Sequence, residues 1–205
     1  MRQCMSDSKE HILNAAFRLF LKKSFKDVTM KELVRETGLS KGAFYHYFES
    51  KEQLFSEMIQ KFMTSMMDIN FDRFSRKSLY EFYHDYLDDQ NAMTNAFIRQ
   101  VSKNSGDSGN FNYFTLFFDA MKLIPGTIGK FKKMNESEIA TWASVVSAAK
   151  KSGEIRTAMT DEQVGRFFHQ TEQGLSMQLI LEERIQDWKK DVTELWDAFY
   201  LQLKV

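Results

Sequence analysis

The apolar positions of this chain recur every three or four residues along nearly its whole length, which is the spacing of amphipathic helices. A first helix is predicted from about Ser8 to Lys23. Its apolar stripe consists of Ile12, Ala15, Ala16, Leu19 and Phe20. Thr29 and Glu32 have the spacing of a capping box, so we expect a second helix to begin there and to end at Gly38.

Three short helices followed by a longer one form the N-terminal pattern. Ser40 is placed to cap the third helix, and Ser50 with Gln53 has the spacing of a capping box for the fourth. Beyond residue 68, helices are expected at 78–103 with a break near 88–91, at 111–124, at 136–152, after Thr160 and after Asp187, with a loop at 104–110. The predicted fold class is therefore all-α, with about nine helices.

The composition supports a helical protein. The 205 residues include one proline and nine glycines, which is few for a sheet protein with many turns. Residues 1–63 carry a net charge of +3 and the remainder −3, which is the sign expected if the N-terminal part binds a polyanion. Cys4 is the single cysteine, and the sequence has neither an apolar leader nor a run of about 18 apolar residues. We therefore expect a cytoplasmic protein that does not cross a membrane.

The segment GLSKGAFYHYFESKEQLF, from Gly38 to Phe55, has two different faces. At helical pitch, Phe44 and Phe48 fall on one side and are expected to pack against the first two helices. The residues on the opposite side are small or can donate hydrogen bonds to bases: Lys41, Gly42, Ala43 and His46. A slim outer face of this kind fits the major groove of DNA.

Several hydroxyl and ammonium groups near this segment are suited to phosphate oxygens. They belong to Thr29, Tyr45, Tyr47 and Lys51. Gly42 is not explained by helix stability, because glycine costs about 1 kcal/mol relative to alanine inside a helix. The alternative interpretation is that the aromatic residues are ordinary core and that His46 is an ordinary surface residue. The pattern alone leaves both interpretations open.

Four stretches of the N-terminal part match a family pattern: ILNAAFRLF at 12–20, FKDVT at 25–29, LVRETGLS at 33–40 and KGAFYHYFESKEQLF at 41–55. In these stretches the chain resembles the TetR family of transcriptional repressors. The resemblance implies a helix-turn-helix DNA-binding domain over residues 1–49. It also implies a helical domain over residues 50–205 that dimerises and binds a small effector, with no cofactor and no catalysis.

The resemblance also implies a role for individual residues. Positions that face bases in the family correspond to Lys41, Gly42, Ala43 and His46. Positions that often contact the DNA backbone correspond to Thr29, Ser40, Tyr45, Tyr47 and Lys51. The partners implied are double-stranded DNA with a palindromic operator, a second copy of the chain and a small effector.

Two positions depart from the family pattern. Ser24 stands where glycine is usual, so the turn is expected to need a conformation that glycine adopts more easily. Val34 stands where a small residue is common, and it is expected to widen the contact between the second and third helices. Neither position lies on the outward face of residues 41–46.

The last two predicted helices are candidates for a dimer interface. Their apolar stripes contain Val164, Phe167, Leu175, Leu179, Trp188, Val192, Leu195, Trp196, Phe199 and Leu203. Such stripes could simply be buried within one subunit. Large aromatic residues are enriched in interfaces, however, and a dimer matches a palindromic site, so we predict a four-helix interface.

The C-terminal part contains more aromatic and sulfur-containing side chains than a small helical domain needs. The candidates for an effector pocket are Phe82, Tyr86, Phe97, Phe114, Phe117, Phe118, Met121, Trp142, Phe168, His169, Gln173 and Met177. Most of them would serve as ordinary core, and a subset could line a mainly apolar cavity. His169 and Gln173 are the possible polar contacts for the effector.

An enzyme and a protein-binding adaptor are the alternative classes. The four histidines lack metal-binding spacing, and the sequence contains no GxSxG, GxGxxG or P-loop pattern. Asp88 and Asp89 are adjacent, so on a helix they point in different directions and do not form an acid and base pair. A helical adaptor would explain the helices but would leave the outward face of residues 41–51 without a role.

Overall fold

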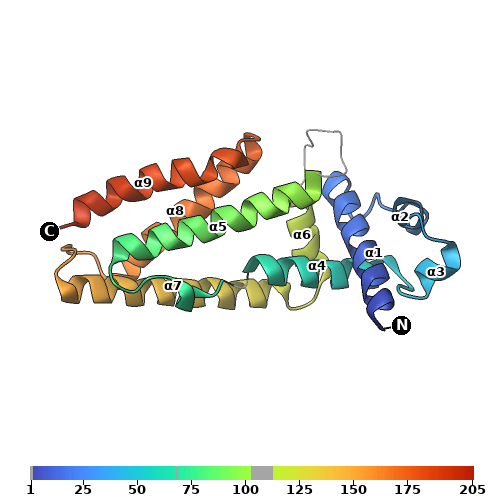
Figure 1. Ribbon diagram of the computed structural model, residues 1–205, viewed down its shortest axis with the longest axis horizontal. Coiled ribbons are helices and arrows are strands. Elements are labelled where there is room, and N and C mark those ends of the chain that lie inside the picture. Colours follow the sequence, from blue (N-terminus) through green and yellow to red (C-terminus); the bar gives the residue numbers. More distant parts are fainter. Residues whose placement is uncertain (1, 68, 103–112) are drawn as a thin grey trace. The chain divides into compact units, whose positions relative to one another are not determined.

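The computed structural model describes residues 2–67, 69–102 and 113–205, and these ranges are helical apart from turns and loops (Figure 1). The helices are α1 (Arg2–Lys22), α2 (Met30–Thr37), α3 (Lys41–Tyr45), α4 (Lys51–Met67), α5 (Leu79–Ser102), α6 (Tyr113–Leu123), α7 (Thr127–Ser152), α8 (Asp161–Leu181) and α9 (Trp188–Leu203), with short 3₁₀ helices η1 (Phe71–Arg73) and η2 (Ile185–Asp187). The prediction of an all-α fold with about nine helices is confirmed. The predicted loop at 104–110 lies outside the described residues.

The chain divides into two compact units. Unit 1 consists of Met1–Asp68 and Val101–Lys130, and unit 2 consists of Ile69–Gln100 and Phe131–Val205. Unit 1 therefore contains α1 to α4 and α6, and unit 2 contains most of α5 and α7 together with α8 and α9. The predicted boundary at residue 49 concerns the DNA-binding segment and stays a prediction.

Aromatic side chains form the centre of unit 1. Phe20 of α1 and Phe55 of α4 meet edge to face, with ring centroids 4.9 Å apart. Phe44 and Phe48 are both 0 % exposed, which confirms the prediction that this side of the third helix faces the core. Burying one such ring contributes on the order of 1.5 to 3 kcal/mol. The two phenylalanines therefore fix α3 from one side and leave its other side at the surface.

Unit 2 packs α5, α7, α8 and α9 around a cluster of large rings (Figure 1). Trp142 of α7 stacks on Phe168 of α8 with ring centroids 5.2 Å apart, and it meets Trp196 of α9 edge to face at 5.3 Å. The α7 and α8 backbones approach closely at Gly165, where an added Cβ atom would lie 3.0 Å from the backbone nitrogen of Ala143. A side chain at Gly165 would therefore require α7 to move by a few tenths of an ångström, so glycine suits this close crossing.

Helix α5 runs without the predicted break near residues 88–91. The polar residues that suggested a break are compatible with a helix, and two of them are held by ion pairs on its surface: Asp88 with Lys189, and Asp89 with Arg73. The pattern of polar residues therefore marks a solvated face of the helix and not its end.

Two helices begin earlier than predicted. Helix α7 starts at Thr127 and not at residue 136, because its first turns are polar and carry no apolar stripe. Lys132 and Glu136, which lie 3.8 Å apart one turn from each other, pair on this polar part. Helix α1 starts at Arg2, since the polar residues before Ser8 include no helix breaker. No helix in the described ranges is both long enough and apolar enough to cross a membrane.

Candidate nucleic-acid interface

Helix α2, a tight turn and helix α3 form the predicted helix-turn-helix. Thr29 caps α2 in a capping box: its Oγ1 accepts from the Glu32 amide at 3.2 Å, and Glu32 Oε2 accepts from the Thr29 amide at 3.0 Å. Gly38 ends α2 in a left-handed conformation with φ 66°. Ser40 then caps α3 by accepting from the Ala43 amide at 3.2 Å. These three predictions of helix ends are confirmed.

The outward face of α3 carries the small and polar side chains that the sequence predicted for it. Lys41, Gly42, Ala43 and His46 are all exposed, while Phe44 between them is buried. A Cβ atom added at Gly42 would meet no atom within 4 Å, so packing inside the protein does not require glycine there. The four predicted base-facing residues are therefore free to approach a partner, and their contacts with bases stay a prediction.

The residues expected to contact the DNA backbone surround this face. Thr29, Ser40 and Tyr45 are exposed and Tyr47 is half-buried. The ammonium of Lys41 lies 5.8 Å from the ring centroid of Tyr45, so these two side chains share one side of α3. Thr29 and Ser40 combine this surface position with a capping role.

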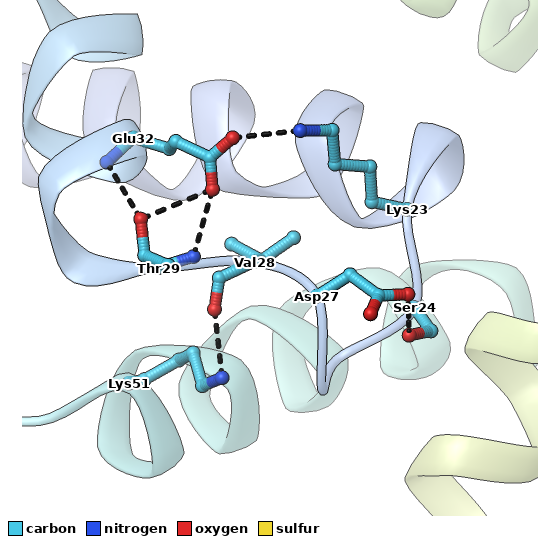
Figure 2. A network of polar contacts seen from close by, with 7 residues as sticks. All are labelled: Lys23, Ser24, Asp27, Val28, Thr29, Glu32 and Lys51. Carbon is cyan, nitrogen blue, oxygen red and sulfur yellow. Dashed lines mark hydrogen bonds and ion pairs between the residues drawn. The ribbon is translucent and has the colours of Figure 1, made fainter.

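Lys51 has a structural role that the sequence did not reveal (Figure 2). From the first turn of α4, its Nζ donates to the backbone carbonyls of Phe25 and Val28, both at 2.7 Å, and lies 4.3 Å from the centroid of the Phe25 ring. An ammonium has three N–H groups, so at most one remains for a phosphate. The expected contact of Lys51 with the DNA backbone stays a prediction. In the protein, Lys51 also stabilises the turn between α1 and α2.

The same turn is fixed on its other side by a polar network (Figure 2). Lys23 pairs with Glu32 Oε1 at 2.6 Å, and Ser24 Oγ donates to Asp27 at 2.5 Å. The hydrogen bond from Lys23, followed by those from Thr29, lowers the pKa of Glu32 to about 2. Ser24 does not adopt the left-handed conformation expected of a residue in a glycine position, since Glu183 is the one non-glycine residue with positive φ in the described ranges.

Helix α6 also holds this turn. The backbone N–H of Phe25 donates to Asp119 Oδ2 at 2.8 Å, and both residues belong to unit 1. Phe25 is therefore bonded through its carbonyl to α4 and through its amide to α6. No sequence pattern predicts this contact, because the two residues are 94 positions apart.

Most of the predicted dimer residues lie inside unit 2. Those at most 5 % exposed are Val164, Leu179, Trp188, Val192, Trp196 and Leu203. They pack on the rings of their own subunit and offer no surface to a second one. Phe167, Leu175 and Phe199 are partly buried, and Leu195 is 39 % exposed. Phe167 and Phe199 stack with ring centroids 3.7 Å apart, which joins α8 and α9 next to these surface positions.

The predicted effector residues are distributed over both units. Unit 2 buries Phe82, Tyr86, Trp142, Phe168 and His169, whereas Gln173 is half-buried and Met177 is 50 % exposed. In unit 1, Phe114, Phe117 and Met121 are half-buried and Phe118 is 61 % exposed. The side chain of Phe97 lies outside the described residues. The structure thus brings together the unit 2 aromatic residues as one cluster, in agreement with an ordinary core.

A buried carboxyl group in unit 2, that of Glu138, was missed by the sequence interpretation. Glu138 lies one turn before Trp142 on α7 and is 8 % exposed, and its Oε2 is 3.3 Å from Nδ1 of His169. Glu172 follows His169 on α8. The available signal was the register of Glu138, which falls on the same helical face as Trp142 and Val145.

These features define a class: an all-α protein in which an N-terminal helix-turn-helix presents a slim exposed face. The sequence model of the family described as "Bacterial regulatory proteins, tetR family" matches residues 12–58. Over these residues the chain is similar to tetR-family regulatory proteins, and this similarity supports a transcriptional regulator of that family.

Curated relatives are similar to part of the chain. An uncharacterized HTH-type transcriptional regulator of Bacillus subtilis (strain 168), YerO, is 50 % identical over 50 residues, which are 24 % of this chain and 17 % of that protein. The transposon Tn10 TetC protein of Escherichia coli is 33 % identical over 89 residues, or 40 % of this chain and 45 % of that protein. The chain thus matches less than half of the length of these curated relatives.

The solved structures extend the similarity of fold beyond the N-terminal part. NalD, the secondary repressor of the MexAB-OprM multidrug efflux pump in Pseudomonas aeruginosa, superposes with a TM-score of 0.65 and 18 % sequence identity over 98 % of each chain. At this identity the likeness concerns the fold alone.

Proposed function

We propose that this chain is a ligand-responsive transcriptional repressor that binds a palindromic operator as a homodimer in the cytoplasm and is released by a small, mainly apolar effector. The observation that carries the proposal is the exposed face of α3, which is slim, cationic at Lys41 and anchored from behind by buried Phe44 and Phe48. A core helix would not need such a face. NemR of E. coli, an HTH-type transcriptional repressor, is 36 % identical over 55 residues. This similarity supports repression and not activation.

Specificity and affinity are proposed to come from different residues. Lys41 and His46 donate to base edges, and Gly42 and Ala43 allow the helix to enter the major groove closely. Thr29, Ser40, Tyr45, Tyr47 and the remaining N–H of Lys51 contact phosphates. The cap positions are suited to this role, because backbone amides at a helix N-terminus favour anions.

The dimer is proposed to form through the outer faces of α8 and α9. On α8, Phe167, Gly174 and Leu181 recur every seven residues along a stripe beside the buried Val164 and Phe168. Leu181 is 66 % exposed, and a Cβ atom at Gly174 would meet nothing within 4 Å. Such a stripe allows a second helix to approach closely, and Leu195 of α9 extends it.

Release is proposed to follow a shift between two conformations of the dimer. An effector bound in the C-terminal part favours a conformation in which the two DNA-binding segments no longer match half-sites about 34 to 36 Å apart. The effector must bind this conformation more tightly than the DNA-bound one, because otherwise it shifts nothing.

Selection of bound sites from a random pool of duplex oligonucleotides tests this function. We expect a palindrome whose half-sites are separated by about one helical turn. The variant Lys41→Glu is the control, since it reverses the charge of an exposed residue and should lose the selected site without unfolding. Recovery of sequences with no preference over random DNA would refute the repressor and favour an adaptor.

A further inference from the structure

The end of α2 is bonded to the first helix by a histidine. Nε2 of His11 in α1 lies 2.8 Å from the backbone carbonyl oxygen of Thr37, the last residue of α2, although the two residues are 26 positions apart. A carbonyl oxygen can only accept, so Nε2 carries a proton and donates it to this bond. Carbonyls in the last turn of a helix have no partner within the helix, so His11 satisfies an acceptor that α2 leaves open.

Thr37 organises the turn of the helix-turn-helix. It is 6 % exposed, and its Oγ1 donates to the Val34 carbonyl at 2.8 Å and accepts from the Leu39 amide at 3.4 Å. Gly38, in its left-handed conformation, and Ser40, the cap of α3, follow directly in the chain. The position of Thr37 against α1 therefore sets the point at which α3 begins.

The far end of the α3 segment is attached to the same turn of α1. Lys9 Nζ lies 5.5 Å from the ring centroid of Phe48, which follows α3, and 2.6 Å from Glu57 Oε2 of α4. These residues and His11 all belong to unit 1. The chain thus meets α1 just before the exposed face of residues 41–46 and again just after it, so one turn of α1 fixes both ends of that face.

We propose that His11 is a positioning residue for operator recognition. In this role it does not contact DNA, but holds the start of α3 through the Thr37 carbonyl so that Lys41 and His46 reach base edges in register. The inference rests on the proposed function, because it assigns a residue outside the helix-turn-helix to the recognition of DNA.

The position of His11 favours a geometric role over a purely stabilising one. Its side chain is exposed and therefore adds little to the apolar core. The hydrogen bonds of base recognition, however, are confined to donor and acceptor distances of about 2.7 to 3.2 Å. A small displacement of α3 that the core tolerates would therefore break contacts with bases.

Two other roles of His11 make different predictions. If the imidazole contacted a phosphate, its loss would weaken binding to every sequence and lower the salt dependence of binding by about one counterion. If it served stability alone, a variant that is still folded would bind its operator like wild type. A positioning role instead predicts a loss that is confined to the operator, with an unchanged salt dependence.

Fluorescence anisotropy with the full chain, the selected operator and a random duplex of equal length tests the inference. His11→Leu removes the donor, whereas His11→Gln keeps an N–H donor on a side chain of similar reach. We expect His11→Leu to lower operator affinity at least fivefold and affinity for random DNA less than twofold. His11→Gln should recover most of the lost operator affinity.

Asp7→Leu is the matched control, because Asp7 is an exposed residue one turn before His11 on α1. It should preserve the ratio of operator affinity to random affinity. Urea unfolding and circular dichroism show that each variant is folded under the conditions of binding, and His11→Ala replaces His11→Leu if the leucine variant does not fold.

The inference is overturned if folded His11→Leu keeps the operator affinity of wild type, or if it binds operator and random DNA equally more weakly. It is also overturned if His11→Gln is no better than His11→Leu, or if Asp7→Leu causes the same loss.

The wild-type chain separates this inference from the proposed function. A wild type that selects a palindrome, with His11→Leu binding it normally, retains the repressor function and loses only the role of His11. A wild type that selects no DNA sequence refutes the repressor function, and the role of His11 falls with it.

Discussion

At the scale of single residues, the most informative positions are those whose identity the fold does not require. Gly42 has room for a side chain and costs helix stability, yet the helix around it is anchored by two buried phenylalanines. His46 lies at the end of α3 and is exposed. Its ring centroid is 5.2 Å from that of the neighbouring Tyr47. Residues of this kind are expected to serve a partner.

His46→Ala is expected to relax sequence specificity without lowering stability. The imidazole can donate to one base edge, so its loss should reduce discrimination at one base pair of each half-site by about 1 to 3 kcal/mol. Fluorescence anisotropy with the selected operator and with single-base variants of it measures this effect. Equal weakening on operator and random DNA would instead assign His46 to the DNA backbone.

Lys51→Met is expected to destabilise the protein, because the carbonyls of Phe25 and Val28 lose their charged donor while the aliphatic stem is kept. Hydrogen bonds to charged groups support a loss of about 1 to 3 kcal/mol in the free energy of unfolding. Urea unfolding measures the change, and Lys41→Met is the control, since the exposed Lys41 should leave stability unchanged. If both variants are equally stable, the ammonium of Lys51 serves DNA alone.

Glu138→Gln is expected to stabilise the protein at pH 8 and to leave it unchanged near pH 4. The pKa of Glu138 is about 7 in the folded chain and near 4.5 when unfolded, so the unfolded state loses its proton first and wild-type stability falls as the pH rises between these values. Each pKa unit corresponds to about 1.4 kcal/mol, which gives a gain for the variant of about 1 to 3 kcal/mol at pH 8.

Urea unfolding of wild type and Glu138→Gln across pH 4 to 8 measures this difference. Glu136→Gln is the control, and its exposed position predicts a change of less than about 0.5 kcal/mol. A constant difference between Glu138→Gln and wild type across the whole range would show that Glu138 keeps an ordinary pKa.

At the scale of helices, Gly174 reports whether α8 meets another subunit. Gly174→Ala adds a methyl group in open space and should raise helix stability by up to about 1 kcal/mol. Gly174→Arg places a long charged side chain in the centre of the proposed stripe and should convert the dimer to a folded monomer. Analytical ultracentrifugation together with circular dichroism distinguishes these outcomes. A Gly174→Arg dimer of unchanged stability would place the interface elsewhere.

The sequence predicted helices wherever capping residues and an apolar stripe occur together. Thr29 and Thr160 therefore predicted the starts of α2 and α8, and Gly38 predicted the end of α2. The start of α7 was missed because its first turns are polar, and the contact of Phe25 with Asp119 was missed because it depends on tertiary packing. An apolar stripe also does not tell which partner covers it, which is why Trp188 and Trp196 were assigned to an interface and lie in the core.

At the scale of the whole molecule, the proposed symmetry makes a prediction about DNA geometry. A dimer holds its two α3 helices at a fixed separation, so half-sites must lie on the same side of the duplex and about one turn apart. Inserting five base pairs between the selected half-sites rotates one of them by about half a turn. One subunit then loses its base contacts, and affinity should fall at least 100-fold.

Insertion of ten base pairs returns both half-sites to the same side of the duplex but places them about one turn further apart. It should therefore recover little of the affinity. Gly174→Arg supplies the internal comparison in the same anisotropy assay, because a monomer reads a single half-site and should bind all three DNA molecules weakly and equally. Wild-type binding that does not depend on the spacing would mean that each chain binds DNA alone, and the symmetric assembly would then have no role in recognition.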